Sequence, residues 1–305
     1  MKHMKTLFPA LLALVLLTGC GRDYYTLETT LSVPTGEDIP QVSTALPETS
    51  PVGAISAPAV VTEGREPTEK FDLPAEVVDI DAWRDHSSRR DDMPVGKLIE
   101  LPEKDVALYG VGVYPAGGSV AWLRWGDSLA EFDWKFGGPR MVMPALWCFD
   151  ADSDGQEEVV AVTCGGIGTG LSISELHIVE KSEDGTLTDY CLSRDLFDEL
   201  SSVMRTEAVS GRAFAVLGTE LVDFTKRLPE DADLADMEGL VAGDIVYFEI
   251  MPDSDWGAYI RFRGSAWLDG IFPSMVGYVV DVAANVAYEN GGFTLSEIHL
   301  NSKNN

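Results

Sequence analysis

The sequence predicts a mainly β, α+β fold: an antiparallel β-rich domain with one or two short helices, preceded by a signal peptide and a disordered tether. Apolar and charged residues alternate with the period of a strand through much of residues 102–305, and a single segment shows a clear helical period. Residues 20–101 show neither period and are rich in Pro, Thr, Ser, Glu and Val. We therefore expect a signal peptide at 1–19, a tether at 20–101 and the β-rich domain at 102–305, which forms either one globular domain or two subdomains with a break near 205–230.

Alternation is clearest at two places in the domain. In "AEFDWKF", Phe132, Trp134 and Phe136 share one face of an expected strand, and charged residues occupy the other. The runs "DIVYFEIMP" and "GAYIRFRG" flank the turn "DSDWG", and this arrangement predicts a hairpin in which Ile260 and Phe262 share a face. Further strands are expected at 106–114, 119–125, 158–164, 172–180, 212–217, 277–288 and 293–300.

Helical signals are few. In "SRDLFDELSSVM", Ser193 can cap a helix whose apolar face holds Leu196, Phe197, Leu200, Val203 and Met204. A second short helix is expected near Asp233. In "EVVDIDAWRDHSSRRDDMP", late in the tether, a short helix or strand would dock on the domain with Trp83 as its anchor.

Two five-residue segments of the domain nearly repeat: "SELHI" at 174–178 and "SEIHL" at 296–300. Both follow a turn that contains glycine, which fits two strands placed alike in one sheet. Leu176 and Ile178 would then face inward, and Glu175 and His177 outward. Chance is the alternative, because strands draw on a small set of residues.

The chain begins "MKHMKTLFPALLALVLLTGC", a basic start followed by an apolar stretch too short to span a bilayer, as in a secretory signal. The residues Leu17-Thr18-Gly19-Cys20 resemble the bacterial lipobox. That resemblance implies that Cys20 carries a diacylglyceryl group and that the protein is anchored to the bacterial cell membrane, facing outside the cytoplasm. An ordinary cleaved signal ending in cysteine is the alternative.

The formal net charge is -28, which argues against binding to nucleic acid or anionic lipid. If Cys20 is lipidated, Cys148, Cys164 and Cys191 remain, and this odd number leaves at least one thiol free or paired between chains. We interpret all three as small buried apolar residues.

The stretch "FDADSDGQEEVVAVT" places carboxylates at positions 1, 3, 5 and 9 counted from Asp150, with Gly155 at position 6. Oxygen ligands at this spacing suit a hard cation such as Ca²⁺. An EF-hand also requires a glutamate at position 12 and two flanking helices. Position 12 is Ala161 within an expected strand, so the sequence argues against an EF-hand.

The same stretch resembles the calcium loop of VCBS and FG-GAP repeats, D-x-D-x-D-G-x-x-[DE], which links two strands of a hairpin. The resemblance implies side-chain ligands at Asp150, Asp152, Asp154 and Glu158 and a backbone ligand at Gln156. It covers about fifteen residues, and no second copy supports a propeller. An Asp- and Gly-rich turn without an ion is the alternative.

A longer segment, from "WLRWGDSLAEFDWKF" through "SELHIVE", together with the terminal "DVAANVAYENGGFTLSEIHL", is similar to extracellular segments of gut Firmicutes lipoproteins and BlaR-type sensor proteins. Those segments carry no activity to transfer, and the HExxH motif of the sensors' membrane part is absent. The resemblance therefore suggests a location outside the cell and a sensing or binding role.

A candidate binding surface comprises Trp256 in the "DSDWG" turn and the row Tyr259, Arg261 and Arg263, a positive strip on an acidic protein. Cross-strand pairing of the arginines with acids such as Glu249 is the alternative. We expect a non-catalytic surface protein with a structural Ca²⁺ loop that binds a cell-wall component, a glycan or a protein. The alternative is a hydrolase acting on envelope or dietary polymer, although no catalytic motif is present.

Overall fold

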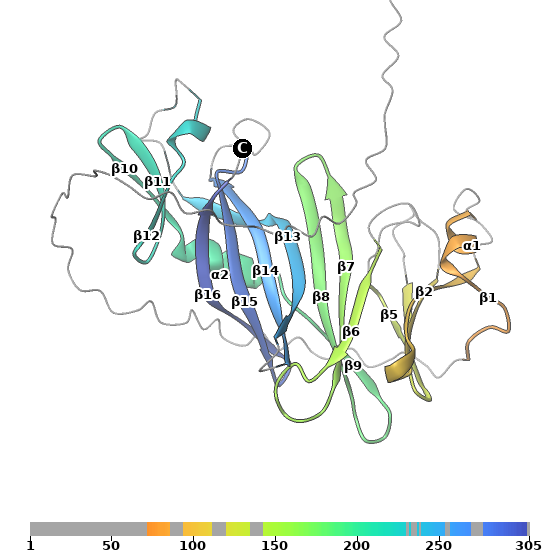
Figure 1. The fold of residues 1–305 in the computed structure, drawn as a ribbon. Helices are drawn as coiled ribbons and strands as arrows, with labels where there is room; N and C mark the ends of the chain where they lie inside the picture. Colours follow the sequence, from red (N-terminus) through yellow and green to blue (C-terminus); the bar gives the residue numbers. More distant parts are fainter. Residues whose placement is uncertain are drawn as a thin grey trace, which may run out of the picture. The chain divides into compact units, whose positions relative to one another are not determined.

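The computed structural model describes residues 72–85, 94–111, 120–134, 143–229, 232, 237, 239–253, 257–269 and 277–303. All of them belong to one compact unit, Thr49–Asn305. Most of the described residues lie in antiparallel strands, and the described α-helices are two short ones, which confirms the predicted fold class (Figure 1). The predicted signal peptide, Cys20, residues 21–71 of the tether and the helix expected near Asp233 lie outside the described residues.

A five-stranded sheet contains the first strands, in the order β1-β2-β3-β4-β5. Its members are β1 (Val77–Val78), β2 (Val95–Leu101), β3 (Val106–Val111), β4 (Val120–Trp125) and β5 (Ser128–Phe132); α1 (Ile80–Asp85) lies between β1 and β2, and the 3-10 helix η2 (Pro102–Lys104) precedes β3. β1 runs parallel to β2, and the other pairs are antiparallel. Phe132 and Trp134 are buried while Glu131 and Asp133 are exposed, as the alternation predicts.

The folded part begins before residue 102. β2 pairs with β3 although it lies in the segment predicted as tether. Trp83 of α1 is buried against β2, as its predicted anchoring role requires. A Cβ atom at Gly96 would lie 2.4 Å from Cγ of Trp83, so only glycine at this position leaves room for the indole. The docking of a short helix through Trp83 agrees with the prediction, whereas the strand β2 within residues 20–101 was not predicted.

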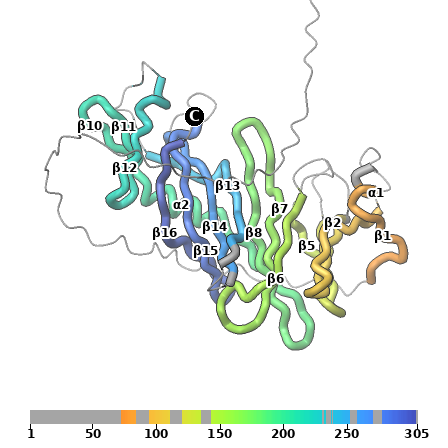
Figure 2. The backbone as a smooth tube through the Cα atoms, in the orientation of Figure 1, coloured from red at the N-terminus to blue at the C-terminus, as the bar shows by residue number. Residues whose placement is uncertain are grey.

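The larger sheet has eight strands, in the order β16-β15-β14-β13-β8-β7-β6, and β9 pairs with β8 (Figures 1 and 2). Its members are β6 (Ala145–Phe149), β7 (Glu158–Gly168), β8 (Leu171–Lys181), β9 (Leu187–Cys191), β13 (Leu240–Asp253), β14 (Gly257–Leu268), β15 (Val280–Glu289) and β16 (Gly292–Ser302). β13 and β8 are parallel, and the other pairs are antiparallel. The predicted hairpin is β13–β14, with Ile260 and Phe262 buried.

A smaller three-stranded sheet consists of β10 (Arg205–Val209), β11 (Arg212–Leu217) and β12 (Glu220–Asp223), followed by the 3-10 helix η3 (Thr225–Arg227). Ala213, Ala215 and Leu217 of β11 belong to the same buried cluster as the eight-stranded sheet. Residues of this region, among them Ala213 and Phe224, therefore contribute to the same buried cluster as the eight-stranded sheet, and the subdomain break suggested near 205–230 stays a prediction.

Helix α2 (Asp195–Val203) is the helix predicted in "SRDLFDELSSVM". Leu196, Phe197 and Leu200 are buried, and the ring of Phe197 lies 5.3 Å from that of Phe262 in β14. The hydroxyl of Ser193 accepts a hydrogen bond from the Asp195 amide at 3.2 Å, which satisfies a backbone donor before the first turn. The helix thus covers the sheet with the apolar face that its period predicted.

The hairpin β7–β8 is buried on both faces. Val160 and Ile178 belong to the larger cluster, shared with α2 and β13–β16. Val159 and Val179 belong to a second cluster, shared with the five-stranded sheet. The prediction that Leu176 faces inward is confirmed, but the prediction that His177 faces outward is wrong: His177 is buried, because the opposite face of β8 is covered as well.

No helix among the described residues combines the length and apolar character needed to cross a bilayer.

Candidate functional site

The acidic loop connects two paired strands. Phe149, the last residue of β6, lies opposite Glu158, the first residue of β7, and residues 150–157 form the loop. Ser153 and Gly155 have left-handed backbones, with φ of 66° and 91°, and the latter value favours glycine. Strands rather than helices flank the loop, as the hairpin prediction requires.

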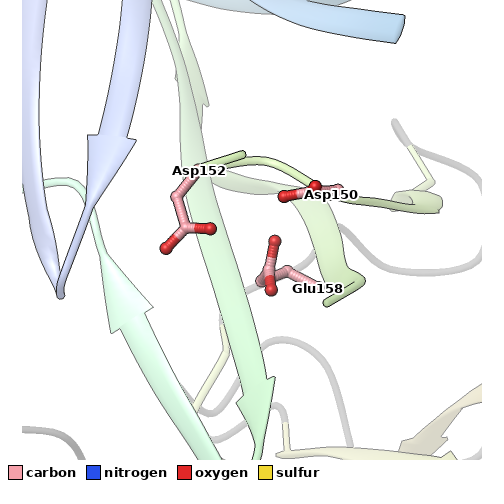
Figure 3. A group of neighbouring side chains, drawn as sticks. All are labelled: Asp150, Asp152 and Glu158. Carbon is pink, nitrogen blue, oxygen red and sulfur yellow. The ribbon is translucent and has the colours of Figure 1, made fainter. Parts of the chain in front are cut away.

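The loop brings three of the four predicted carboxylates together. One oxygen from each of Asp150, Asp152 and Glu158 lies within 4.8 Å of the others. Figure 3 shows the three side chains turned toward a common space, with Glu158 rising from the strand below the two aspartates. Glu158 is only 3% exposed although its carboxylate belongs to a hairpin loop.

Backbone amides hold these carboxylates in place. Asp150 accepts hydrogen bonds from the amides of Asp154 and Gly155, at 3.1 and 3.0 Å. Asp152 also accepts one from Asp154, at 3.1 Å, and Glu158 accepts one from Ala151 at 2.7 Å. The side chains are therefore positioned before any ligand binds, although the aspartate bonds are also those of an ordinary Asp-rich turn.

The other two predicted ligands contact each other. Asp154 accepts hydrogen bonds from the backbone and side-chain nitrogens of Gln156, at 2.7 and 3.2 Å. Its carboxylate is not part of the three-residue group. The roles assigned to Asp154 and to the Gln156 carbonyl stay predictions.

The electrostatics of the group favour a positive charge. Burial, together with the charges of the neighbouring aspartates, raises the pKa of Glu158 to about 7. The pKa of Asp152 is also raised, first by burial and then by the charges of Asp154 and Asp150. A cation at this place would remove both causes, because it would replace lost water and neutralise like charges.

The donor set consists of oxygens alone, which suits hard cations such as Ca²⁺ and Mg²⁺. The nearest thiol, Cys148, has its pKa raised to about 11 by burial and by the charge of Glu157, so it is a neutral thiol. Cys148, Cys164 and Cys191 are all free, but each is only partly buried, so the interpretation of all three as buried residues is wrong. The arrangement can hold a cation.

The predicted binding surface lies partly on β14. Tyr259, Arg261 and Arg263 share the face opposite to the buried Ile260 and Phe262. Nε of Arg263 lies 2.9 Å from a carboxylate oxygen of Glu249 on β13, so the pairing alternative is confirmed for this arginine. Trp256 lies outside the described residues.

A buried polar network escaped the sequence reasoning. Nδ1 of His177 lies 3.2 Å from Asp189 in β9, and Nε2 lies 3.3 Å from the hydroxyl of Thr163 in β7. The indole of Trp134 stacks on the imidazole and donates to Asp189 at 2.7 Å. The continuous apolar run "VVAV" at 159–162 was a signal that both faces of this hairpin are buried.

The network carries a charged pair inside the protein. Burial lowers the pKa of His177, but the charge and hydrogen bond of Asp189 raise it more, so that it reaches about 10. The contacts run from the hydroxyl of Thr163 to the imidazole of His177 and on to the carboxylate of Asp189, as they do between the nucleophile, base and acid of a hydrolase triad. All three side chains are buried, so no substrate reaches the hydroxyl in this structure, and we interpret the network as structural.

Fold and site together define a β-rich α+β protein with an acidic hairpin loop whose three converging carboxylates could hold a cation, and with an arginine-bearing sheet face. A scan against protein-family models matched none, and searches of curated proteins and of solved structures likewise returned no match.

Proposed function

We propose that this chain is a lipid-anchored bacterial surface protein with a binding role outside the cytoplasm, in which a Ca²⁺ ion braces the β6–β7 hairpin. The observation that carries the metal proposal is the buried Glu158 carboxylate, which converges with Asp150 and Asp152 within 4.8 Å. The lipobox-like Leu17-Thr18-Gly19-Cys20 supports the anchor.

Glu158 distinguishes a cation site from an ordinary turn. Exposed aspartates in a turn need no ion, because backbone amides satisfy them. A buried glutamate that faces two other acids is costly to ionise, and its raised pKa reflects that cost. A bound cation would offset the cost and make the carboxylate the inner ligand of the site.

The ion has a structural role in this proposal. The carboxylates come from both ends of the loop, Asp150 after β6 and Glu158 at the start of β7, so a shared cation would tie the strand ends together. Lys104 of η2 forms an ion pair with Glu157, which links the same loop to the five-stranded sheet. A loop fixed in this way would resist local opening.

Calorimetric titration of the full chain in mild detergent with CaCl₂, after treatment with chelator, tests the metal proposal. Ca²⁺ at about 100 times Kd should stabilise the protein by about 2.7 kcal/mol, measured as a rise in melting temperature. Glu158→Gln should abolish both the binding heat and the rise. The matched variant Glu157→Gln, which removes an adjacent acid outside the group, should keep both. If the native chain shows neither heat nor shift, the loop is an empty turn.

The anchor has its own test. Cys20→Ser should move the protein from the membrane fraction to the soluble fraction of cells that express it, because the acyl chains can no longer be attached. Unchanged retention in the membrane fraction would contradict lipid anchoring.

A hydrolase is the second candidate, and the chain of contacts Thr163–His177–Asp189 is the observation in its favour. It ranks below the binding function because the Thr163 hydroxyl is buried. Thr163→Val separates the two: loss of hydrolysis of a cell-envelope polymer by a folded variant would favour the hydrolase.

A further inference from the structure

A polar hollow of about 450 Å³ lies on the outer face of strands β13 to β16. Its position follows from the register, because residues directly opposite on paired strands share a face. Tyr247 lies opposite Arg263, which lies opposite Ala283. In the next row Ile245, Ser265 and Asp281 are opposite one another. All six residues line the hollow.

Small residues form the floor of this hollow. Gly264 lines the hollow with its backbone alone, because a Cβ atom there would point to the other face of the sheet, 2.7 Å from the buried ring of Phe262. Ala283 adds only a methyl group between the longer side chains. The depression is therefore part of the packed sheet and does not depend on a loop.

Arg261 supplies a positive charge in the hollow, with no ion-pair or hydrogen-bond partner among the described residues. It lies opposite Glu249, but that carboxylate is engaged by Arg263. No described residue forms an ion pair or a hydrogen bond with Arg261, in a chain that has 50 acidic and 22 basic residues. A guanidinium that no described acid engages can bind an acidic ligand through two parallel hydrogen bonds.

The acidic residue of the hollow is already neutralised. Asp281 accepts a hydrogen bond from the Ser265 hydroxyl at 2.7 Å, and Nζ of Lys303 lies 3.9 Å from it. Its charge therefore opposes an incoming anion less than an isolated carboxylate would. Lys303 itself lies over the ring of Tyr278 and within 3.4 Å of Ser265, which adds a cation to this end of the hollow.

Exposed tyrosines flank the arginines. Tyr247 is 45% exposed and Tyr259 is 36% exposed, and among the described residues they are the only exposed aromatic side chains. Rings that present a flat apolar face and a polar hydroxyl suit the faces and edges of sugar rings. From Tyr259 to Ser265 the strand spans about 20 Å at roughly 3.3 Å per residue, which exceeds a single sugar.

We infer that this face binds an acidic oligosaccharide, with Arg261 pairing with its carboxylate groups and Tyr247 and Tyr259 stacking on its sugar rings. The inference rests on the proposed binding function and names the ligand class. Strands β14 and β15 have partners on both edges, so an acidic peptide could not add itself as a strand beside Arg261 and Arg263. A polar ligand that lies across the side chains fits the face better.

The test is calorimetric titration of the full chain in mild detergent, at low salt and without added Ca²⁺, with a hexamer of α-1,4-linked galacturonic acid. Arg261→Gln should weaken binding at least about tenfold, because it removes a charge-assisted pair. Tyr259→Ala should weaken binding several-fold. The matched variant Arg205→Gln removes an exposed arginine from β10, outside the hollow, and should change Kd less than about twofold.

Two comparison ligands and the matched variant Arg205→Gln decide the outcome. The carboxyl-reduced, neutral hexamer should bind at least about tenfold more weakly than the acid form. Polyglutamate of similar length should also bind weakly, since it offers charge without rings; equal binding of polyglutamate would overturn the glycan assignment. Failure of the acidic hexamer to bind, or equal losses in Arg261→Gln and Arg205→Gln, would overturn the inference. Neither result would affect the Ca²⁺ titration or the Cys20→Ser test, so the two proposals fail separately.

Discussion

The segments "SELHI" at 174–178 and "SEIHL" at 296–300 lie in β8 and β16 of the same sheet, yet their histidines have opposite environments. The side chain of His177 is 5% exposed and that of His299 is 56% exposed. Each contacts a carboxylate from another strand: Asp189, which is buried, and Glu220, which is not.

The difference comes from the neighbours of the two strands. β8 lies inside the sheet, between β7 on one edge and β13 and β9 on the other, and both of its faces are covered. β16 is the last strand of the sheet, and β12 contacts it. Nearly identical residues thus form a buried contact between histidine and carboxylate in one place and a solvated one in the other. What distinguishes them is tertiary position, which five residues cannot encode.

The largest loss of stability is expected when the buried pair of His177 and Asp189 is broken. Asp189→Ala should lower the free energy of unfolding by about 3–5 kcal/mol, because it leaves a buried imidazolium without its counter-charge. The matched change at the exposed pair, Glu220→Ala, should cost at most about 1 kcal/mol. Urea unfolding followed by tryptophan fluorescence measures both. Equal losses would show that the two histidines are not as different as their burial indicates.

Truncating the aliphatic residue before each histidine should also cost more stability in β8 than in β16, but the difference between the two losses should be smaller. Leu176→Ala opens a cavity in the core and should cost about 2–5 kcal/mol. Ile298→Ala should cost about 1–2 kcal/mol, because part of its side chain already contacts water. Thermal melts of the two variants in one buffer suffice. A larger loss at Ile298 would mean that β16 contributes more to the core than β8.

The buried pair should also make stability depend on pH. Because the pKa of His177 is raised in the folded protein to about 10 from an ordinary value near 6.5, its contribution is fully present below about pH 6.5. It should be lost progressively as the pH rises toward 10. Urea midpoints between pH 6 and 10 should fall for the native chain and fall less for His177→Gln. Identical slopes would argue that the imidazole is neutral when folded.

The smallest effect is expected at the exposed histidine. His299→Gln should change the free energy of unfolding by less than about 0.5–1 kcal/mol, since exposed pairs contribute little. A loss above about 2 kcal/mol would show instead that the contact between β12 and β16 depends on this residue. The same urea measurement serves.

Much of the fold could be predicted because alternation persists wherever one face of a strand meets solvent. β14 is the clearest case, with Ile260 and Phe262 inward and the arginines outward. Alternation could not reveal the environment of His177, since both faces of β8 are buried. It also could not show that β2 belongs to the five-stranded sheet, because its "VGKLIEL" follows a long segment of tether-like composition.

The candidate metal loop was predictable as a hairpin, because its carboxylates and Gly155 precede a strand. Which carboxylates converge was not predictable, since Asp154 binds Gln156 through contacts that spacing alone does not specify. The network around His177 could be predicted even less from the sequence. Asp189 and Trp134 lie 55 residues apart in the sequence, and their contact depends on the packing of the five-stranded sheet against the larger one.

The burial of both faces of β7 limits how recombination could exchange parts of this domain during evolution. Val159 and Val160 are successive residues, and they belong to different buried clusters. No break in the chain can therefore separate the clusters, because the boundary between them runs along one strand rather than between two segments. A recombination event that brought in one half would leave a bare apolar face on that strand. The two halves should be passed on together, as a single module of some two hundred residues.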